Sequence, residues 1–356
     1  FTKFNKYLQK RLLVIIMIIP TIPTPDELLD KGFRRGKKAA DEVRSSKMPR
    51  RLKPKRIEEV RVVTACQVIK DRLKMINDRT PTVEELPIFY QDYIDITVGI
   101  DDLKKSLGAL NWAYGIITQL EKDYAKKIRR YPPEKASQLR SQAYGRVASV
   151  AKKISKDLDF LDFAKSQLRN MPTIDFDATT IVIAGFPNVG KSTLLRQLTD
   201  AEPEIADYPF TTKGIQIGHI ERNWKHIQII DTPGLLDRPI SDMNDIEMNA
   251  MVALEDLADA ILFIFDASET CGYTLEHQNN LLTEIQKVFS APIIVLFNKI
   301  DIAEYETGSD RFDYIDKFIK MNENPLLISA SEGEGIDKIL KVFDSVKKIN
   351  RNNDDY

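Results

Sequence analysis

The 356-residue sequence predicts two domains: an all-α antiparallel helical bundle, followed by an α/β domain with a doubly wound, mostly parallel sheet of six strands. Three observations support this. Apolar residues recur at helical spacing in the first half of the chain, whereas short β-rich runs alternate with helical patterns in the second half. The composition, 43% hydrophobic and 29% charged, is typical of a globular protein.

The first domain is expected over residues 25–170 as a basic helical bundle. Pro25 followed by two acidic residues is typical of a helix start, because proline fits the first turn and acids favour its positive dipole end. Three later segments, 62–76, 103–117 and 147–161, each carry one apolar stripe that advances by three and four residues. One stripe per helix, with basic residues elsewhere, predicts antiparallel helices that share a core.

The second domain is expected over residues 171–349, with 350–356 as a frayed tail. Two of its β-rich runs are apolar throughout, as expected for strands buried on both faces of a parallel sheet, and two others are close enough to form a hairpin. The six runs are Thr180–Ala184, Gln216–Ile220, His226–Ile230, Ile261–Phe265, Ile293–Phe297 and Leu326–Ser329.

Residues 1–24 are interpreted as an N-terminal extension that is non-native or flexible before Met17, the expected natural start. The apolar run Leu12–Ile19 resembles the core of a secretory signal, which is the alternative interpretation. The run is far shorter than the ~20 residues that cross a bilayer, and no small-residue cleavage site follows it. Cys66 and Cys271 form no spacing motif, which favours a reduced, cytoplasmic protein without a membrane partner.

A phosphate-binding loop follows the first of the β-rich runs. Gly185–Ser192 (GFPNVGKS) matches G-x-x-x-x-G-K-[ST], in which backbone N–H groups face the phosphates and the next helix adds its positive end. Lys191 is expected to reach the β- and γ-phosphates, and the Ser192 hydroxyl to bind Mg²⁺. The residues assigned to nucleotide contact in this loop are Gly185, Asn188, Val189, Gly190, Lys191, Ser192 and Thr193.

The motif Asp231–Gly234 (DTPG), again after a β-rich run, is expected to form the γ-phosphate side of the site. Asp231 would hold Mg²⁺ directly or through water, and the Gly234 N–H would contact the γ-phosphate. Between the two motifs, the sequence YPFTT is placed to give a threonine to Mg²⁺ and the γ-phosphate. Thr212 is favoured and Thr211 is the alternative. Loops that close on the γ-phosphate and relax after hydrolysis act as switches.

The motif NKID identifies the base. Guanine offers N1–H and its 2-amino group to the Asp301 carboxylate, whereas adenine presents an unprotonated nitrogen there. Lys299 is expected to cover the ring, and Asn298 to tie this loop to the phosphate loop. The residues assigned to the base are Asn298, Lys299, Asp301, Ser329, Ala330 and Ser331, the last three as a source of backbone N–H for guanine O6. Together the motifs predict a P-loop GTPase that binds GTP or GDP with Mg²⁺ and hydrolyses GTP.

Catalysis is expected to be slow, because Leu235 stands where many GTPases place the glutamine that orients water. The catalytic candidates are Lys191, Thr212, Gly234 and Asn188. Some related GTPases use an asparagine at the position of Asn188 to ligate K⁺, which would neutralise charge in the transition state. The alternative is that Asn188 hydrogen-bonds the switch backbone and shapes the loop. Both interpretations stay open.

With these residues identified, the sequence resembles the Nog (nucleolar GTP-binding protein) family within the Obg-related GTPases. The resemblance rests on YPFTTKG, DTPGLLDRP and NDIEMNAMVALEDLADAILFIFDASETCGYTLEHQ, and on the N-terminal TIPTPDELLDKGFRR. It covers about residues 20–346, and so both domains. It implies a factor in assembly of the large ribosomal subunit whose helical domain contacts ribosomal RNA. The first sixteen residues have no counterpart in the family pattern, and the resemblance leads us to expect the short archaeal form, without the long C-terminal extension of eukaryotic members.

The charge distribution independently favours a polyanion partner. Residues 1–170 hold 36 Lys and Arg against 21 Asp and Glu, whereas the remainder holds 16 against 32. Three basic segments, 31–38, 47–56 and 126–135, are candidates for contact with rRNA or a pre-ribosome, and Tyr131 could stack on a base. Two alternatives remain: a helical domain that binds a protein partner without RNA, and a structural protein with a vestigial nucleotide site.

Overall fold

The computed structural model describes residues 19–49, 52–169, 171–199, 201–209, 211, 214–302 and 325–349. The expectations for residues 1–16, Met17 and the tail 350–356 therefore fall outside the described residues. The chain divides into two compact units: Phe1–Leu86 with Val98–Arg169, and Pro87–Thr97 with Asn170–Tyr356. Within the described ranges, no helix is both long and apolar enough to cross a bilayer.

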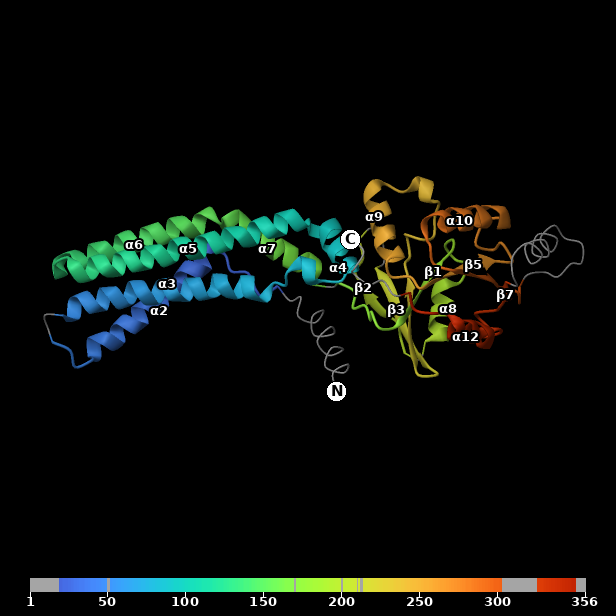
Figure 1. Cartoon of the computed structure of the whole chain (residues 1–356), viewed down its shortest axis with the longest axis horizontal. Helices are drawn as coiled ribbons and strands as arrows, with labels where there is room; N and C mark the ends of the chain where they lie inside the picture. Colours follow the sequence, from blue (N-terminus) through green and yellow to red (C-terminus); the bar gives the residue numbers. More distant parts are fainter. Residues whose placement is uncertain are drawn as a thin grey trace, which may run out of the picture. The chain divides into compact units, whose positions relative to one another are not determined.

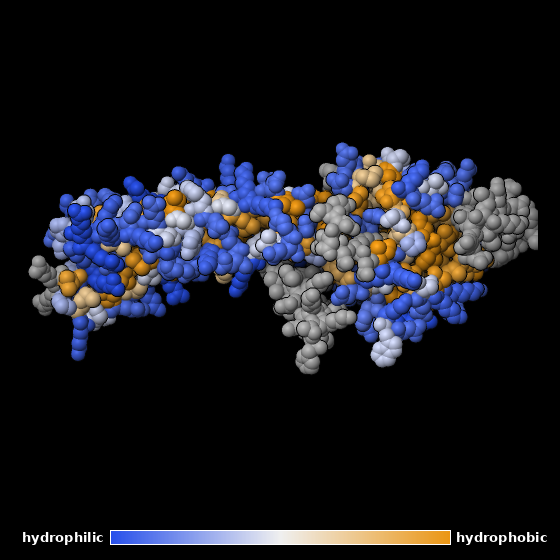
Figure 2. Space-filling model, viewed as in Figure 1, coloured by the Kyte–Doolittle hydropathy of each residue, from blue (hydrophilic) through white to orange (hydrophobic). Residues whose placement is uncertain are grey.

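The first unit is the helical bundle that the sequence predicts (Figure 1). Helices α2, α3, α5 and α6 run alongside one another, and α7 continues the line of α6. The visible face of these helices is mostly hydrophilic (Figure 2). The elements are α2 (Pro25–Ser45), α3 (Lys53–Arg79), the short 3₁₀ helix η1 (Val83–Glu85), α5 (Ile100–Arg130), α6 (Pro133–Lys153) and α7 (Ser155–Leu168).

The predicted apolar stripes form the core of the bundle, with two local differences. The stripe on α3 is buried at every predicted position from Val62 to Ile76. On α5 the predicted Leu107 and Tyr114 are only half-buried, and the smaller Ser106 and Ala113 are buried instead. The third stripe crosses a break between α6 and α7. The residue at the break, Ile154, has φ −93° and ψ 14° but remains buried.

Helix α4 (Ile88–Val98) falls within the range 25–170 expected for the bundle, but all of it except Val98 groups with the second unit. The aromatic side chains of α4 explain why. The Tyr90 hydroxyl donates to the carbonyl oxygen of Pro172 and accepts from the N–H of Ile174, both at 3.0 Å. The ring of Phe89 stacks on that of Tyr208 with 6.0 Å between centroids. These partners are distant in sequence, and no local pattern reveals them.

In the residues that the structure describes, the second unit contains a seven-stranded sheet in the order β2-β3-β4-β1-β5-β6-β7. The expected number of six strands is therefore wrong. The additional strand, β2, has three residues and pairs antiparallel with β3 at the sheet edge. The β3–β4 hairpin is also antiparallel, and all other pairs are parallel. The strands are β1 (Thr179–Ala184), β2 (Glu204–Ala206), β3 (Ile215–Arg222), β4 (Lys225–Asp231), β5 (Ala260–Asp266), β6 (Ile293–Asn298) and β7 (Leu326–Leu327).

Helices cover this sheet and leave the carboxyl ends of its parallel strands to the loops (Figure 1). Strands β1 and β5 are buried at every residue, as expected for the middle of a parallel sheet. Strand β7 is shorter than the predicted run Leu326–Ser329. The helices are α8 (Lys191–Leu198), the 3₁₀ helix η2 (Ile240–Asp242), α9 (Asp245–Glu255), α10 (Leu275–Val288) and α12 (Ile336–Ser345).

Candidate nucleotide-binding site

The phosphate loop lies between β1 and α8, and two of its glycines are required by close packing. Gly185 has φ +137°, and a Cβ there would lie 2.5 Å from the carbonyl oxygen of Ile264. Gly190 has φ +105°, and a Cβ there would lie 2.2 Å from the Asn298 side-chain nitrogen. No side chain fits either position, because the phosphate loop packs directly against β5 and Asn298. Of the other assigned residues, Val189 is buried while Asn188 and Thr193 are exposed.

The side chain of Lys191 is buried beneath the loop. Its ammonium group donates to the carbonyl oxygens of Gly185 at 2.7 Å and Phe186 at 2.9 Å. Burial lowers the pKa of Lys191, and the nearby Asp237 and Asp231 carboxylates oppose that effect. A buried cation whose hydrogen bonds go to neutral carbonyls is well placed to gain an anionic partner such as a phosphate.

Ser192 and Asp231 meet at one point, as the magnesium interpretation requires. The Ser192 hydroxyl donates to Asp231 Oδ2 at 2.9 Å. Asp231 is fully buried, and burial raises its pKa, although Lys191 and Ser192 oppose this rise. Its other oxygen, Oδ1, has no hydrogen-bond partner within the described part of the chain. A buried carboxylate oxygen beside a hydroxyl fits a hard, oxygen-seeking cation, so these residues suit Mg²⁺.

Of the two threonine candidates, the structure describes one. Thr212 lies outside the described residues. Thr211 is half-buried, and its hydroxyl donates to the carbonyl oxygen of Tyr208 at 2.8 Å. The Tyr208 hydroxyl in turn donates to the carbonyl oxygen of Ala250 at 2.7 Å, which anchors this loop to α9.

Asn298 joins three loops of the site. Its amide nitrogen donates to the carbonyl oxygen of Val189 at 2.8 Å, and its amide oxygen accepts from the N–H of Ala330 at 2.9 Å. The base loop, the phosphate loop and the Ser329–Ser331 loop are therefore tied together by one side chain. Because the Ala330 N–H already has a partner, a contact with guanine O6 would share this group or use a neighbour.

Lys299 and Asp301 lie on the same turn after β6. Asp301 is exposed, with its carboxylate open to a ligand. Lys299 has φ +63°, and its ammonium group donates to Asp266 Oδ2 at 2.8 Å and to the Thr270 hydroxyl at 2.9 Å. Burial raises the pKa of Asp266, but hydrogen bonds from Lys299, Ser268 and the Cys271 N–H outweigh burial and lower it overall.

Sequence reasoning missed Asp266, Thr270 and the aromatic pair that supports the phosphate loop. The rings of Phe186 and Tyr273 stack with centroids 4.0 Å apart. Asp266 lies at the carboxyl end of β5. Functional residues commonly lie at the carboxyl ends of parallel strands, so this position could have indicated Asp266 from the sequence.

The Asp231–Gly234 motif continues into a tightly held turn. Leu235 and Leu236 are 0% and 1% exposed, and the carbonyl oxygen of Leu236 accepts from the N–H of Gly185 at 3.0 Å. Leu235 therefore packs into the core and offers nothing to a water molecule. The N–H of Gly234 donates to Asp237 Oδ2 at 2.8 Å.

Comparison with known proteins assigns both units. The family described as "NOG1 N-terminal helical domain" matches residues 17–175, and the family described as "50S ribosome-binding GTPase" matches residues 180–299. An uncharacterized protein of Methanocaldococcus jannaschii is 50% identical over 289 residues, which are 81% of each chain. Nucleolar GTP-binding protein 1 of Drosophila melanogaster is 38% identical over 272 residues, or 75% of this chain and 42% of that protein.

A solved Plasmodium falciparum structure named as nucleolar GTP-binding protein 1 is 34% identical and covers 49% of this chain and 89% of that one, with a TM-score of 0.43. The chain spans less than half the length of the Drosophila melanogaster and Arabidopsis thaliana proteins that it matches. Its second unit is a GTPase domain. From the two matched domains and these relatives, we conclude that the chain belongs to the nucleolar GTP-binding protein 1 family.

Proposed function

We propose that this protein is a cytoplasmic GTP-hydrolysing switch that acts in assembly of the large ribosomal subunit. The observation that supports the switch best is the convergence of four loops on one site. Asn298 ties the base loop to the phosphate loop and to Ala330, while Ser192 meets Asp231 from the next strand. The ribosomal role is inferred from the family and from the description "50S ribosome-binding GTPase" that fits residues 180–299.

In this proposal each group of the site has a separate task. The backbone of 185–190 and the buried Lys191 hold the phosphates, and Asp301 reads the two donors on the guanine edge. Ser192, Asp231 and the threonine at 212 would hold Mg²⁺, which supplies positive charge against the triphosphate. The Gly234 N–H contacts the γ-phosphate, so that the loop after β4 responds to its presence.

The binding assignment is tested by titrating the nucleotide-free protein with GTP, GDP and ATP in the presence of Mg²⁺. We expect tight binding of both guanine nucleotides, with ATP weaker by at least about 10³-fold, because adenine places an acceptor against Asp301. Equal affinity for ATP and GTP would overturn the assignment of the base loop.

For hydrolysis, we propose that a monovalent cation at Asn188 replaces the missing glutamine. Two observations support this. Leu235 is fully buried, whereas Asn188 is exposed in the phosphate loop, with a φ of +63°. A K⁺ ion there would neutralise charge that develops between the β- and γ-phosphates. The alternative, in which Asn188 only shapes the loop, predicts no preference for K⁺.

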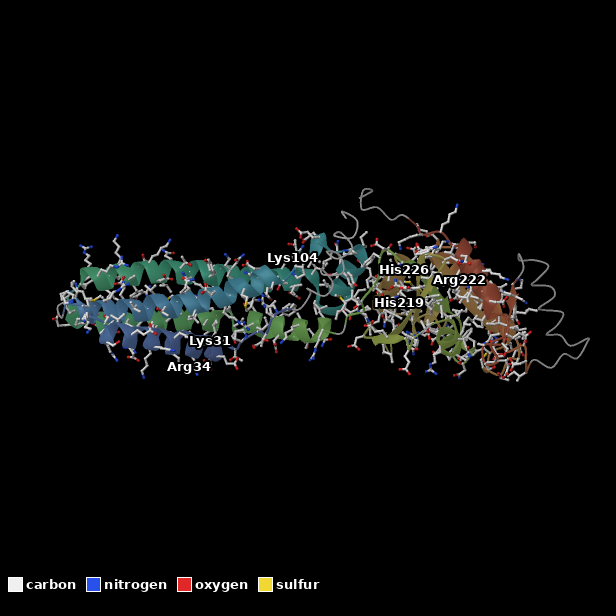
Figure 3. All side chains as sticks on the ribbon, turned by 90° about the horizontal axis from the view of Figure 1, so that it is seen from below. Lys31, Arg34, Lys104, His219, Arg222 and His226 are labelled. Carbon is white, nitrogen blue, oxygen red and sulfur yellow. The ribbon has the colours of Figure 1, made fainter. Side chains whose placement is uncertain are left out.

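We further propose that the basic surface of the bundle binds ribosomal RNA. The segment 31–38 lies within α2, and Figure 3 shows Lys31 and Arg34 on this helix. Gly32 and Gly36 face α3, where a Cβ would lie 2.9 Å from Ile69 and 2.5 Å from the carbonyl oxygen of Arg61. This close approach leaves the basic side chains on the opposite, exposed side: Lys31, Arg34, Arg35, Lys37 and Lys38.

The other two basic segments meet at one end of the bundle. Lys55 Nζ donates to the carbonyl oxygen of Arg129 at 2.9 Å, and Arg129 bonds the buried Glu59. Lys53 likewise donates to the carbonyl oxygen of Ser46 at 3.0 Å. The ammonium groups of Lys53 and Lys55 therefore form hydrogen bonds within the bundle. Arg50 and Arg51 lie outside the described residues. Exposed basic side chains at this end include Lys47, Lys126, Lys127, Arg130 and Lys135, with Tyr131 beside them at 44% exposure.

A protein partner for the bundle is the second candidate function. It would require an apolar anchor on the same helices, and Trp112, at 46% exposure, is one such side chain. The distribution of charge favours RNA over a protein partner, because the excess lysine and arginine side chains in residues 1–170 can neutralise RNA phosphates.

A further inference from the structure

The carboxylate of Asp237 lies between the two groups that are assigned to the terminal phosphate of GTP. Its Oδ2 accepts from the Gly234 N–H at 2.8 Å, and the same oxygen lies 3.9 Å from Lys191 Nζ. The side chain is 13% exposed, so these contacts are made inside the site and not at its rim. Asp237 therefore presents a negative oxygen to a backbone donor and to a cation, which is what a γ-phosphate oxygen does.

We propose that Asp237 is an internal substitute for the γ-phosphate, an autoinhibitory contact that GTP displaces and GDP leaves in place. This inference rests on the proposed function, since it requires that the site holds guanine nucleotides. A γ-phosphate between Gly234 and Lys191 would meet the Asp237 carboxylate at short range, and two negative groups repel strongly in a buried site. GDP lacks that phosphate and meets no such conflict.

The fold determines which residues respond when Asp237 moves. The loop is fixed before Asp237, because Leu235 and Leu236 are buried and Leu236 bonds Gly185. After Asp237, polar contacts hold the chain: Arg238 pairs with Glu247 of α9 at 2.6 Å, and the N–H of Ile240 donates to Glu284 of α10 at 2.6 Å. A displacement of Asp237 would therefore change the positions of residues 238–247 and their contacts with α9 and α10.

A purely local role for Asp237 would be to cap the turn at Gly234, three residues earlier. The two roles differ in what they predict for nucleotide choice. A turn cap affects GTP and GDP equally, whereas a carboxylate that competes with the γ-phosphate weakens GTP alone. The substitution Asp237→Asn separates them, because the amide oxygen still accepts from the Gly234 N–H while the charge is removed.

The test measures the Kd of the non-hydrolysable analogue GMP-PNP and of GDP for wild type, Asp237→Asn and Asp242→Asn at fixed Mg²⁺ and ionic strength. Asp242 is exposed in η2 and provides a control with the same change of charge. We expect Asp237→Asn to tighten GMP-PNP about tenfold relative to GDP, and Asp242→Asn to leave the ratio unchanged. Amide hydrogen exchange at Gly234 in nucleotide-free protein gives a second readout: Asp237→Ala should accelerate it, and Asp237→Asn should not.

An unchanged GMP-PNP to GDP ratio in Asp237→Asn, with a wild type that binds both nucleotides, would overturn the inference and leave the proposed function intact. Loss of GTP turnover with an unchanged ratio would also overturn it, because Asp237 would then act on the bound γ-phosphate. Failure of the wild type to bind any guanine nucleotide would instead overturn the proposed function on which the inference depends.

Discussion

At the scale of single residues, the site depends on side chains that form hydrogen bonds between different loops. Asn298 is the strongest case, because its amide connects Val189 and Ala330, which are 109 and 32 residues away. Lys299 depends on Asp266, whose own pKa is lowered by the hydrogen bonds that it accepts. Asp301, by contrast, has an exposed carboxylate and is the residue best placed to choose the base.

The base assignment predicts a change of specificity in Asp301→Asn. Guanine affinity should fall by about 2–3 kcal/mol, because two charge-assisted hydrogen bonds are replaced by a mismatched amide. Xanthine nucleotides should bind more tightly to this variant than to wild type, since their 2-oxo group accepts from the new amide. Calorimetric titration with GDP and XDP measures both effects, with Asp337→Asn on α12 as the matched control. Loss of GDP binding without a gain for XDP would contradict the proposed contact.

The cation proposal predicts that GTP turnover depends on the monovalent ion. Steady-state hydrolysis by wild type should be faster in K⁺ than in Na⁺ at constant ionic strength, and Asn188→Ala should lose the difference while retaining nucleotide affinity. Equal wild-type rates in the two salts would contradict the cation proposal and favour the alternative, in which Asn188 only shapes the loop.

Helices and strands that carry a local sequence pattern could be predicted, whereas elements that depend on distant partners could not. Strands β5 and β6 were predictable because their β-rich runs are apolar along their length, and the site motifs because each directly follows a β-rich run. Strand β2 was not, since it is three residues long, two of them exposed, and exists through pairing with β3.

The place of α4 and the role of Asp237 escaped prediction for the same reason. Helix α4 is aromatic-rich and contains no Lys or Arg, unlike the bundle helices, but the partners of its aromatic side chains (Pro172, Ile174 and Tyr208) lie far along the chain. The role of Asp237 depends on its position beside Lys191, which is 46 residues away in the chain and cannot be inferred from a local pattern.

The RNA proposal predicts an effect that depends on which end of the bundle is changed. Substitution of Lys126, Arg130 and Lys135 by glutamine should weaken binding to ribosomal RNA. It should also flatten the dependence of log K on log salt by up to about 0.9 per lost phosphate contact. A triple glutamine variant at Lys105, Lys152 and Lys156, exposed near the start of α5, the end of α6 and the start of α7, is matched in charge and should bind as wild type does. Equal losses in both variants would indicate non-specific attraction.

At the scale of the whole molecule, the chain has two separate cores. The bundle core is built from helical stripes such as Val62–Ile76, and the second core from β1, β5 and the helices around them. Nucleotide binding belongs to the second unit and the excess positive charge to the first. The two activities should therefore be separable by mutation.

Lys191→Ala tests this separation. Nucleotide affinity should fall by at least about 100-fold, because the charged donor to the phosphates is removed. The folded protein should not become less stable, since burial already lowers the pKa of Lys191 and its ammonium is costly to hold without a phosphate. Thermal unfolding followed by circular dichroism, and RNA binding of the variant, should match the nucleotide-free wild type. A loss of helical signal would show that the two cores are not independent.

We propose that GTP governs attachment to the large ribosomal subunit, and co-sedimentation tests this proposal most directly. Purified large subunits are pelleted with the protein in GMP-PNP, in GDP and without nucleotide, alongside Lys191→Ala and the triple variant at Lys126, Arg130 and Lys135. We expect wild type to pellet in GMP-PNP at least severalfold more than in GDP, and both variants to lose this attachment. Equal pelleting in all nucleotide states, unchanged by either variant, would contradict it.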